Sequence, residues 1–178
     1  MSRIWKLPVA IPEKVEVSVK DNTAVVKWPL GELSFAYSDQ VKVEVKDGNI
    51  VSTPIKPEYS AMWGTTRSIL DNMVEWVTNG YKKSLEINGV WYKFEVQGTK
   101  LILSIGYSHK VEMQAPEGVK VMMDEKLKNV IHISGIHKQD VGQFASKVKA
   151  KKKPEPYKGK GIKYVWEHIR RKAGKTGA

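Results

Sequence analysis

The residues best suited to chemistry in this chain lie between Lys151 and Tyr164, in the run KKKPEPYKGKGIKY. Three lysines precede two prolines, a tyrosine, and lysines that alternate with glycines. Proline opposes helix and strand because it lacks an N–H and fixes φ, whereas glycine reaches positive φ and lets the backbone approach a ligand. Such a segment is either a solvated lysine tail or a loop that binds a polyanion. The apolar-periodic segment that follows it favours the binding loop.

Catalytic or metal-binding spacing is absent from the rest of the sequence. The four histidines, at positions 109, 132, 137 and 168, form no HExxH pair, and the chain has no cysteine. His132 lies at an alternating strand position, which favours a structural role. His137 begins a helical segment, which favours capping or phosphate contact. With no Walker loop and no GxSxG elbow, we expect no catalytic residue, metal, cofactor or small-molecule substrate. An enzyme with an unrecognised site is the third reading of the chain.

Positive charge is concentrated toward the C-terminus. The net charge is +11 over 178 residues, but residues 1–80 carry −1, residues 81–178 carry +12, and residues 138–178 alone carry +10. A charge gathered at one end gives a directional field, and phosphate backbones are its commonest partner. Anionic lipid would need a basic amphipathic helix or a lipid anchor, and neither is indicated. We expect no transmembrane helix and no signal peptide, and the lack of cysteine fits a reducing cytoplasm.

The predicted binding residues are the basic, glycine and tyrosine positions of this C-terminal region. Lysine meets a phosphate as a point charge, and arginine can fork onto it. Tyr157 either stacks on an unpaired base or packs against Pro154 and Pro156. Nothing resembles a base-reading helix, so the pattern favours structured RNA, recognised by shape, over sequence-read DNA. The predicted residues are Lys138, Lys151, Lys152, Lys153, Tyr157, Lys158, Gly159, Lys160, Gly161, Lys163, Arg170, Arg171 and Lys172.

Two periodicities organise the first half of the chain. Alternation at period two predicts antiparallel strands at 15–20, 24–28, 33–37, 41–46 and 49–53, with turn signals at 21–22, 29–31 and 47–48. From about residue 58 the period becomes helical, and Gly80 is predicted to stop the helix. Thr65 or Thr66 is the predicted N-cap if the regular helix starts there. The predicted apolar face consists of Met62, Ile69, Met73, Trp76 and Val77.

The second half repeats this plan. Strand-like segments lie at 84–87, 92–96, 101–105, 110–113, 119–123 and 129–134, and a helical segment starts near Lys138. Segment 41–53 parallels segment 119–134, a helix follows in both, and Gly31 corresponds to Gly106. The order predicts an α+β fold of two tandem duplicated domains, residues 1–81 and 82–178. Each domain is expected to pack one helix on a mostly antiparallel sheet.

The segment after the glycine loop has helical spacing of its own. Ile162, Val165, Trp166 and Ile169 recur as on one helix face. We predict a short helix or turn whose apolar face docks on the second domain, with the following basic residues pointing outward.

Five segments carry a family resemblance. They are SRI at 2–4, GTTRS at 64–68 with Asn72 and Met73 after it, GTKLILSIGYSHKVE at 98–112, PEPYKGKGI at 154–162, and GKGIKY at 159–164. Over nearly the whole chain they resemble the sixth protein of the large ribosomal subunit, in its bacterial form. The segment PEPYKGKGI resembles the hallmark loop of that family.

The resemblance implies two duplicated α+β domains, no catalysis, and direct binding to large-subunit rRNA. It implies a cytoplasmic ribosomal location near the sarcin–ricin region and the stalk base, with neighbouring ribosomal proteins as partners and support of the translation-factor site as the role. In the family the second domain makes most of the RNA contact, and Thr66 and Arg67 of the first helix are weaker candidates. The alternative reading is a free-standing structured-RNA-binding module outside the ribosome.

The chain departs from the family pattern at several tryptophans. Trp63 stands where histidine is usual, and Trp28, Trp76 and Trp91 stand where small residues are common. Lys151 and Lys152 replace a more mixed sequence. These departures leave the local packing around the tryptophans open and do not touch the hallmark loop.

Overall fold

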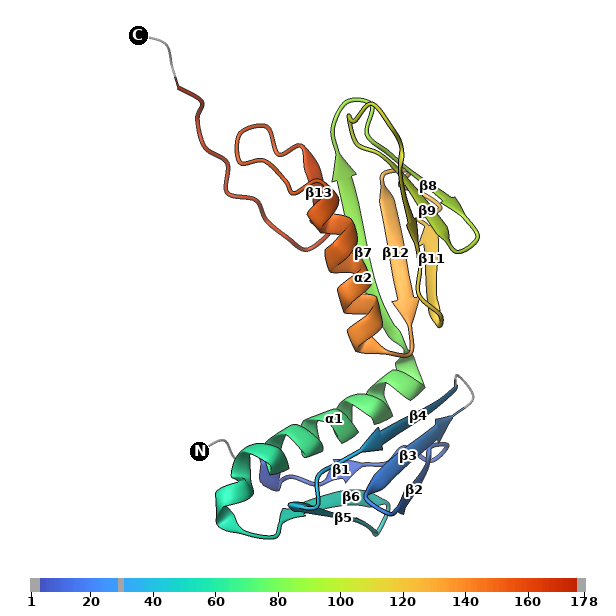
Figure 1. Cartoon of the computed structure of the whole chain (residues 1–178), viewed down its shortest axis with the longest axis vertical. Helices are drawn as coiled ribbons and strands as arrows, with labels where there is room; N and C mark the ends of the chain where they lie inside the picture. The colour runs from blue at the N-terminus through green and yellow to red at the C-terminus, as the bar shows by residue number, and fades with distance from the viewer. Residues whose placement is uncertain (1–3, 29–30, 176–178) are drawn as a thin grey trace. The chain divides into compact units, whose positions relative to one another are not determined.

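The computed structural model describes residues 4–28 and 31–175 of the chain. Contacts within it divide the chain into two compact units, residues 1–80 and 81–178 (Figure 1). Ser2 and Arg3 of the family motif, Pro29 of the predicted turn and the last three tail residues lie outside the described residues.

The first unit contains two antiparallel sheets of three strands each, in the orders β2-β3-β4 and β1-β6-β5. Alternate side chains of both sheets are buried, among them Val26, Leu33, Val43 and Ile50, as expected for sheets with one solvated face. The strands are β1 (Val9–Ala10), β2 (Glu16–Lys20), β3 (Thr23–Trp28), β4 (Gly31–Ala36), β5 (Val41–Lys46) and β6 (Asn49–Pro54). The five predicted strands are confirmed. The two-residue strand β1 is too short to give a period in the sequence.

The helix of the first unit, α1 (Ser60–Asn79), contacts strands of both sheets. A short 3-10 helix (Pro57–Tyr59) leads into it, and another (Ile4–Lys6) lies near the start of the chain. Gly80 ends α1 with φ 69°, and its N–H donates to the carbonyl of Trp76 at 2.9 Å, as predicted.

Helix α1 differs from the prediction at its start and on part of its apolar face. The N-cap is Tyr59 rather than Thr65 or Thr66, because the hydroxyl of Thr65 donates back to the helix carbonyl of Ala61 and does not interrupt the helix. The predicted apolar face is right at Met73 and Val77, which are buried, but Met62 is 40% exposed, and Thr66, which was not predicted on this face, is buried at 1%. The buried face consists of Thr66, Leu70, Met73, Val74 and Val77.

The second unit has one three-stranded sheet, β10-β9-β8, and one four-stranded sheet, β11-β12-β7-β13, and all their pairings are antiparallel. Helix α2 (Lys138–Lys151) packs on β7, β12 and β13 of the larger sheet (Figure 1). The core includes Leu85, Ile131, Val141, Phe144 and Val148. The strands are β7 (Tyr81–Asn88), β8 (Lys93–Gln97), β9 (Lys100–Ser104), β10 (Val111–Gln114), β11 (Val119–Met123), β12 (Val130–Gly135) and β13 (Gly161–Tyr164).

The two units share one topology. In each, three consecutive strands form a meander, the next two form a hairpin, and the strand that opens the unit pairs with the second hairpin strand. The helix follows that hairpin in both units, as the parallel between 41–53 and 119–134 predicts. This repetition confirms an α+β fold of two tandem duplicated domains. Strand β13, which has no counterpart among the described residues of the first unit, is an addition to the edge of β7.

Of the predicted short helix or turn after the glycine loop, only a turn forms, at residues 165–166, and it follows strand β13 at residues 161–164. Ile162 pairs with Ile87 of β7 and is fully buried, whereas Val165 and Trp166 are exposed. An edge strand offers unpaired N–H and C=O groups, and pairing with them satisfies this backbone better than a single helical turn would. The residues from 167 to 175 form no regular element.

The unusual tryptophans occupy different environments. The indole N–H of Trp63 donates to the carbonyl of Ser52 at 2.7 Å, and its ring meets Trp5 edge-to-face at 5.8 Å. Trp28 and Trp76 are half-buried within the first unit. Trp91 is 83% exposed at the β7–β8 turn, with φ 68°. None of these positions is in the hallmark loop.

Candidate nucleic-acid interface

The basic run forms a loop that is closed at its base. The N–H of Ile162 donates to the carbonyl of Lys152 at 2.8 Å, and that of Glu155 donates to the carbonyl of Lys160 at 2.9 Å. Below the loop, the hydroxyl of Tyr107 donates to the carbonyl of Lys151 at 3.0 Å. Because β13 continues into the core, residues 152–160 are held at both ends, as predicted for a binding loop. In Figure 1 the loop follows the last turn of α2 and returns beside β7.

The tail after β13 is tied to this loop. The N–H of Lys172 donates to the carbonyl of Pro156 at 2.8 Å. The guanidinium of Arg171 lies beside Gly159, where an added Cβ would be 3.5 Å from its terminal nitrogen. We call residues 152–160 and 165–172 together the loop-and-tail surface.

The loop-and-tail surface presents its charge to solvent. Lys153, Lys158, Arg170, Arg171 and Lys172 are exposed, and Lys160 is half-exposed. Within the described part of the chain, these six side chains make no ion pair. Tyr157 is 55% exposed, so its ring can be reached by a ligand. Unpaired cations of this kind are available to neutralise phosphates.

Two lysines near this surface are already paired. Lys163 meets Glu86 of β7 at 3.3 Å, and its side chain is only 22% exposed. Lys152 lies over the ring of Tyr107 at 5.0 Å, which is within cation–π range. Both residues position the loop as much as they offer charge to a ligand.

A partly buried ion pair anchors the start of the tail. The ammonium of Lys149, on α2, lies 2.7 Å from both carboxylate oxygens of Glu167, and the N–H of Tyr164 donates to the same carboxylate at 3.1 Å. Partial burial disfavours the charged carboxylate, but the Lys149 bond and the Tyr164 amide outweigh it and lower the pKa of Glu167. The carboxylate is therefore ionised at neutral pH and holds the tail against α2.

The two loop glycines serve the loop's own backbone. Gly161 has φ 137°, and a Cβ there would lie 2.6 Å from the carbonyl oxygen of Lys153. Gly159 is buried and has φ 73°. The close backbone approach predicted for a ligand is, at Gly161, an approach between the two sides of the loop.

The remaining predicted residues lie elsewhere. Lys138 is at the opposite end of α2 from the loop, over the ring of Tyr81 at 5.4 Å. In the first unit, Thr66 is buried, so its hydroxyl is not offered to a ligand in this structure. Arg67 donates to the carbonyl of Leu7 at 3.3 Å and pairs with Asp71 at 2.7 Å.

A hollow of about 340 Å³ lies between the loop, the edge of β7 and the tail. Its basic lining consists of Lys163, His168 and Arg171, and Glu167 stands beside them. Asn88, Gly159 and Ile169 complete the lining. A hollow with this charge suits a phosphate or sugar of a nucleic acid rather than an apolar ligand.

His132 takes part in a hydrogen-bonded chain that has the residue types of a catalytic triad. Its Nδ1 lies 2.9 Å from the hydroxyl of Ser84, and its Nε2 lies 2.9 Å from a carboxylate oxygen of Asp124. The same carboxylate accepts the N–H groups of Leu127 and Lys126, and these bonds, with the His132 ring, lower the pKa of Asp124. These hydrogen bonds from Ser84 through His132 to Asp124 fasten the β11–β12 turn to β7. This is the structural role predicted for His132.

His137 is the N-cap of α2, but its side chain makes no capping bond, so of its two predicted roles only phosphate contact stays a prediction. Within the described residues, no group of three or more His, Asp or Glu could hold a metal ion. None of the described helices is long and apolar enough to cross a bilayer.

A sequence model of the family described as Ribosomal protein L6 matches residues 11–80 and 88–165, one segment in each unit. The chain belongs to the ribosomal protein L6 family. Among its relatives, the large ribosomal subunit protein uL6 of Halothermothrix orenii is 52% identical over 99% of this chain and 100% of its own. The uL6 proteins of Picosynechococcus and Carboxydothermus hydrogenoformans are 50% and 48% identical, each over 99% of this chain and over 99% and 97% of their own length.

Membership in the L6 family confirms the bacterial-type resemblance drawn from the motifs. It makes the chain a structural, non-enzymatic protein of the large ribosomal subunit. The expected location, the ribosomes of the cytoplasm, is confirmed with it.

Sequence reasoning missed the residues that hold the surface in place. Lys149, Glu167 and Tyr107 come from α2, the tail and the β9–β10 connection, and they meet only after the sheet has formed. Lys83 of β7, which lies near three aromatic rings, was missed for the same reason.

Proposed function

We propose that this L6-family protein binds large-subunit rRNA through the loop-and-tail surface of its second unit. We further propose that it does so near the sarcin–ricin region and the stalk base, where it supports the translation-factor site. The observation that carries the first proposal is a closed, cationic loop bonded to a cationic tail. Together, residues 152–175 hold nine Lys and Arg and two Glu, a net charge of +7.

The position of this charge supports a dedicated binding function. Strand β13 carries the loop-and-tail surface, and the first unit, which otherwise shares the topology, has no counterpart to it and a net charge of −1. This extension adds little to the core of the second unit beyond Ile162, but it adds most of the net positive charge of that unit. A polyanionic partner explains such an extension.

Sedimentation of cell lysate tests whether this chain works in the ribosome. We expect the protein to migrate with large subunits after a moderate salt wash, because many simultaneous phosphate contacts keep it bound to the RNA. Migration with free RNA or at the top of the gradient would favour the free-standing RNA-binding module instead.

Filter binding of the full chain tests the proposed location. We expect tighter binding to a large-subunit rRNA fragment that includes the sarcin–ricin neighbourhood than to one of equal length without it. Equal affinity for the two fragments would contradict the location and leave general rRNA binding standing.

A further inference from the structure

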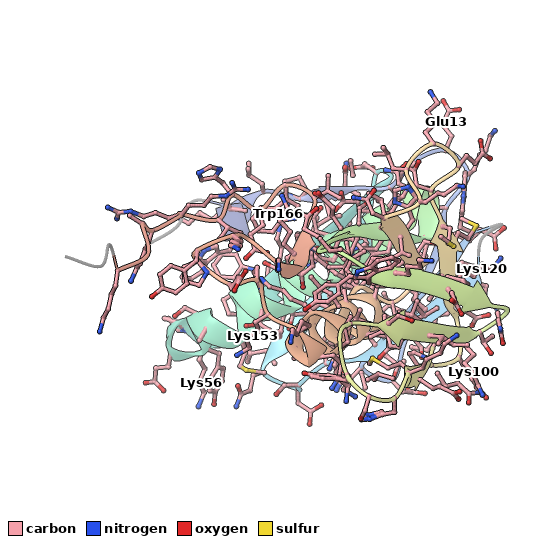
Figure 2. All side chains as sticks on the ribbon, turned by 90° about the horizontal axis from the view of Figure 1, so that it is seen from above. Glu13, Lys56, Lys100, Lys120, Lys153 and Trp166 are labelled. Atoms are coloured by element: carbon pink, nitrogen blue, oxygen red, sulfur yellow. The ribbon has the colours of Figure 1, made fainter. Side chains whose placement is uncertain are left out.

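An exposed aromatic stack lies where β13 passes into the tail. The rings of Tyr164 and Trp166 are nearly parallel, with centroids 5.5 Å apart and planes 10° apart. Tyr164 is half-buried, whereas Trp166, labelled in Figure 2, is 73% exposed. Most of the Trp166 side chain is therefore within reach of a ligand.

The backbone holds this stack in place. The N–H of Val165 donates to the carbonyl of Ser84 at 3.1 Å, and that of Glu167 donates to the carbonyl of Tyr164 at 3.0 Å. The Lys149–Glu167 pair fixes the next residue of the tail. The indole is therefore presented from a fixed turn, so little ordering would accompany ligand binding.

Cations surround the stack. The ammonium of Lys83 lies 5.5, 5.6 and 5.8 Å from the ring centroids of Tyr81, Tyr164 and Trp166. Lys149 lies 4.9 Å from the Tyr164 ring and balances Glu167, the nearest carboxylate in the tail. An apolar protein segment would leave Lys83 without an anionic partner, whereas a nucleotide supplies both a base for the rings and a phosphate for the lysine.

We propose that Trp166 stacks on an unpaired base of the RNA, with Lys83 beside the phosphate of the same or an adjacent nucleotide. This inference rests on the proposed function, since the stack adjoins the loop-and-tail surface and would bind the same RNA. It adds a second aromatic contact to a surface on which Tyr157 is the other exposed ring.

The test uses the full chain and large-subunit rRNA in filter binding over a salt series. The variant Trp166→Leu removes the aromatic ring, Trp166→Phe keeps one, and Trp91→Leu is the control at another exposed tryptophan of the second unit. We expect Trp166→Leu to weaken binding roughly 5- to 150-fold at every salt concentration, since stacking contributes that much per base. Its salt slope should match that of the wild type, and Trp166→Phe should recover most of the affinity.

Chemical probing of unpaired rRNA bases gives a second readout. We expect the wild type to protect a base that Trp166→Leu leaves reactive. Wild-type affinity and protection in Trp166→Leu would overturn the inference while the proposed function stands. Reduced assembly into subunits without a loss of RNA affinity would indicate a protein partner and also overturn it. Failure of the wild type itself to bind rRNA would instead contradict the proposed function.

Discussion

At the residue scale, the loop depends on a glycine for its shape. Gly161 has a φ of 137°, and the space that a Cβ would need there is filled by the backbone of Lys153 and Pro154. No other residue fits there without moving one side of the loop. The backbone of the loop does not require lysine at the positions around Gly161, but it does require glycine at this one.

Gly161→Ala should therefore destabilise the second unit by about 1–3 kcal/mol, since the new Cβ would lie 2.6 Å from the Lys153 carbonyl oxygen. Gly142→Ala is the matched control inside α2, where a Cβ meets nothing within 4 Å. It should stabilise the unit by about 0.5–1 kcal/mol, because alanine loses less entropy in a helix. Urea unfolding measures both, and effects of the same sign would contradict this account of Gly161.

Glu167 makes the anchoring of the tail depend on pH. Its folded-state pKa is lowered, so its contribution is present above the ordinary glutamate pKa and is lost as pH falls through the lowered value. Glu167→Gln should be less stable than the wild type by about 1 kcal/mol at pH 7. The difference should shrink below about pH 4. A difference that stays constant from pH 7 to pH 3 would show that the carboxylate charge is not what anchors the tail.

At the element scale, the strands and helices that could be predicted are those with a regular spacing of apolar residues in the sequence. Period-two alternation gave the strands of both hairpins, and the turns at 47–48 adopt the positive φ that Asp-Gly signals. The C-terminal strand β13 could not be predicted because it depends on the open edge of β7, which lies far away in sequence. On α1 the helical period identified the buried Met73 and Val77 but missed Thr66, because hydrophobicity alone does not place a threonine in the core.

Strand β13 is expected to be held by a single side chain. Ile162→Ala should cost about 2–5 kcal/mol, because Ile162 is fully buried in the core of the second unit. Val165→Ala, at a residue that is 49% exposed, should change stability by less than about 0.5 kcal/mol. Thermal unfolding followed by circular dichroism distinguishes them, and equal losses would contradict the role of Ile162 as the anchor of β13.

At the scale of the whole molecule, the two units share a topology but differ in charge. Both have the same order of strands and helix, but only the second adds β13, the loop and the basic tail. The sequence revealed the basic residues of the surface, because they are neighbours in the chain. It did not reveal that Lys163 is paired with Glu86 or that Arg171 and Lys172 return to the loop, since those contacts depend on tertiary structure.

The salt dependence of rRNA binding by the full chain tests the central claim most directly. The test variant replaces three exposed lysines of the loop-and-tail surface by alanine, and the control replaces three exposed lysines of the same unit outside it. Both lower the net charge by three. The test positions are Lys153, Lys158 and Lys172, and the control positions are Lys93, Lys120 and Lys126.

We predict that the test variant binds large-subunit rRNA more weakly than the wild type. Its log–log salt slope should be shallower by about 2 to 3, since each lost phosphate contact removes roughly 0.7–0.9. The control variant should keep a slope close to that of the wild type. Equal slopes and affinities for the two variants would contradict binding through the loop-and-tail surface.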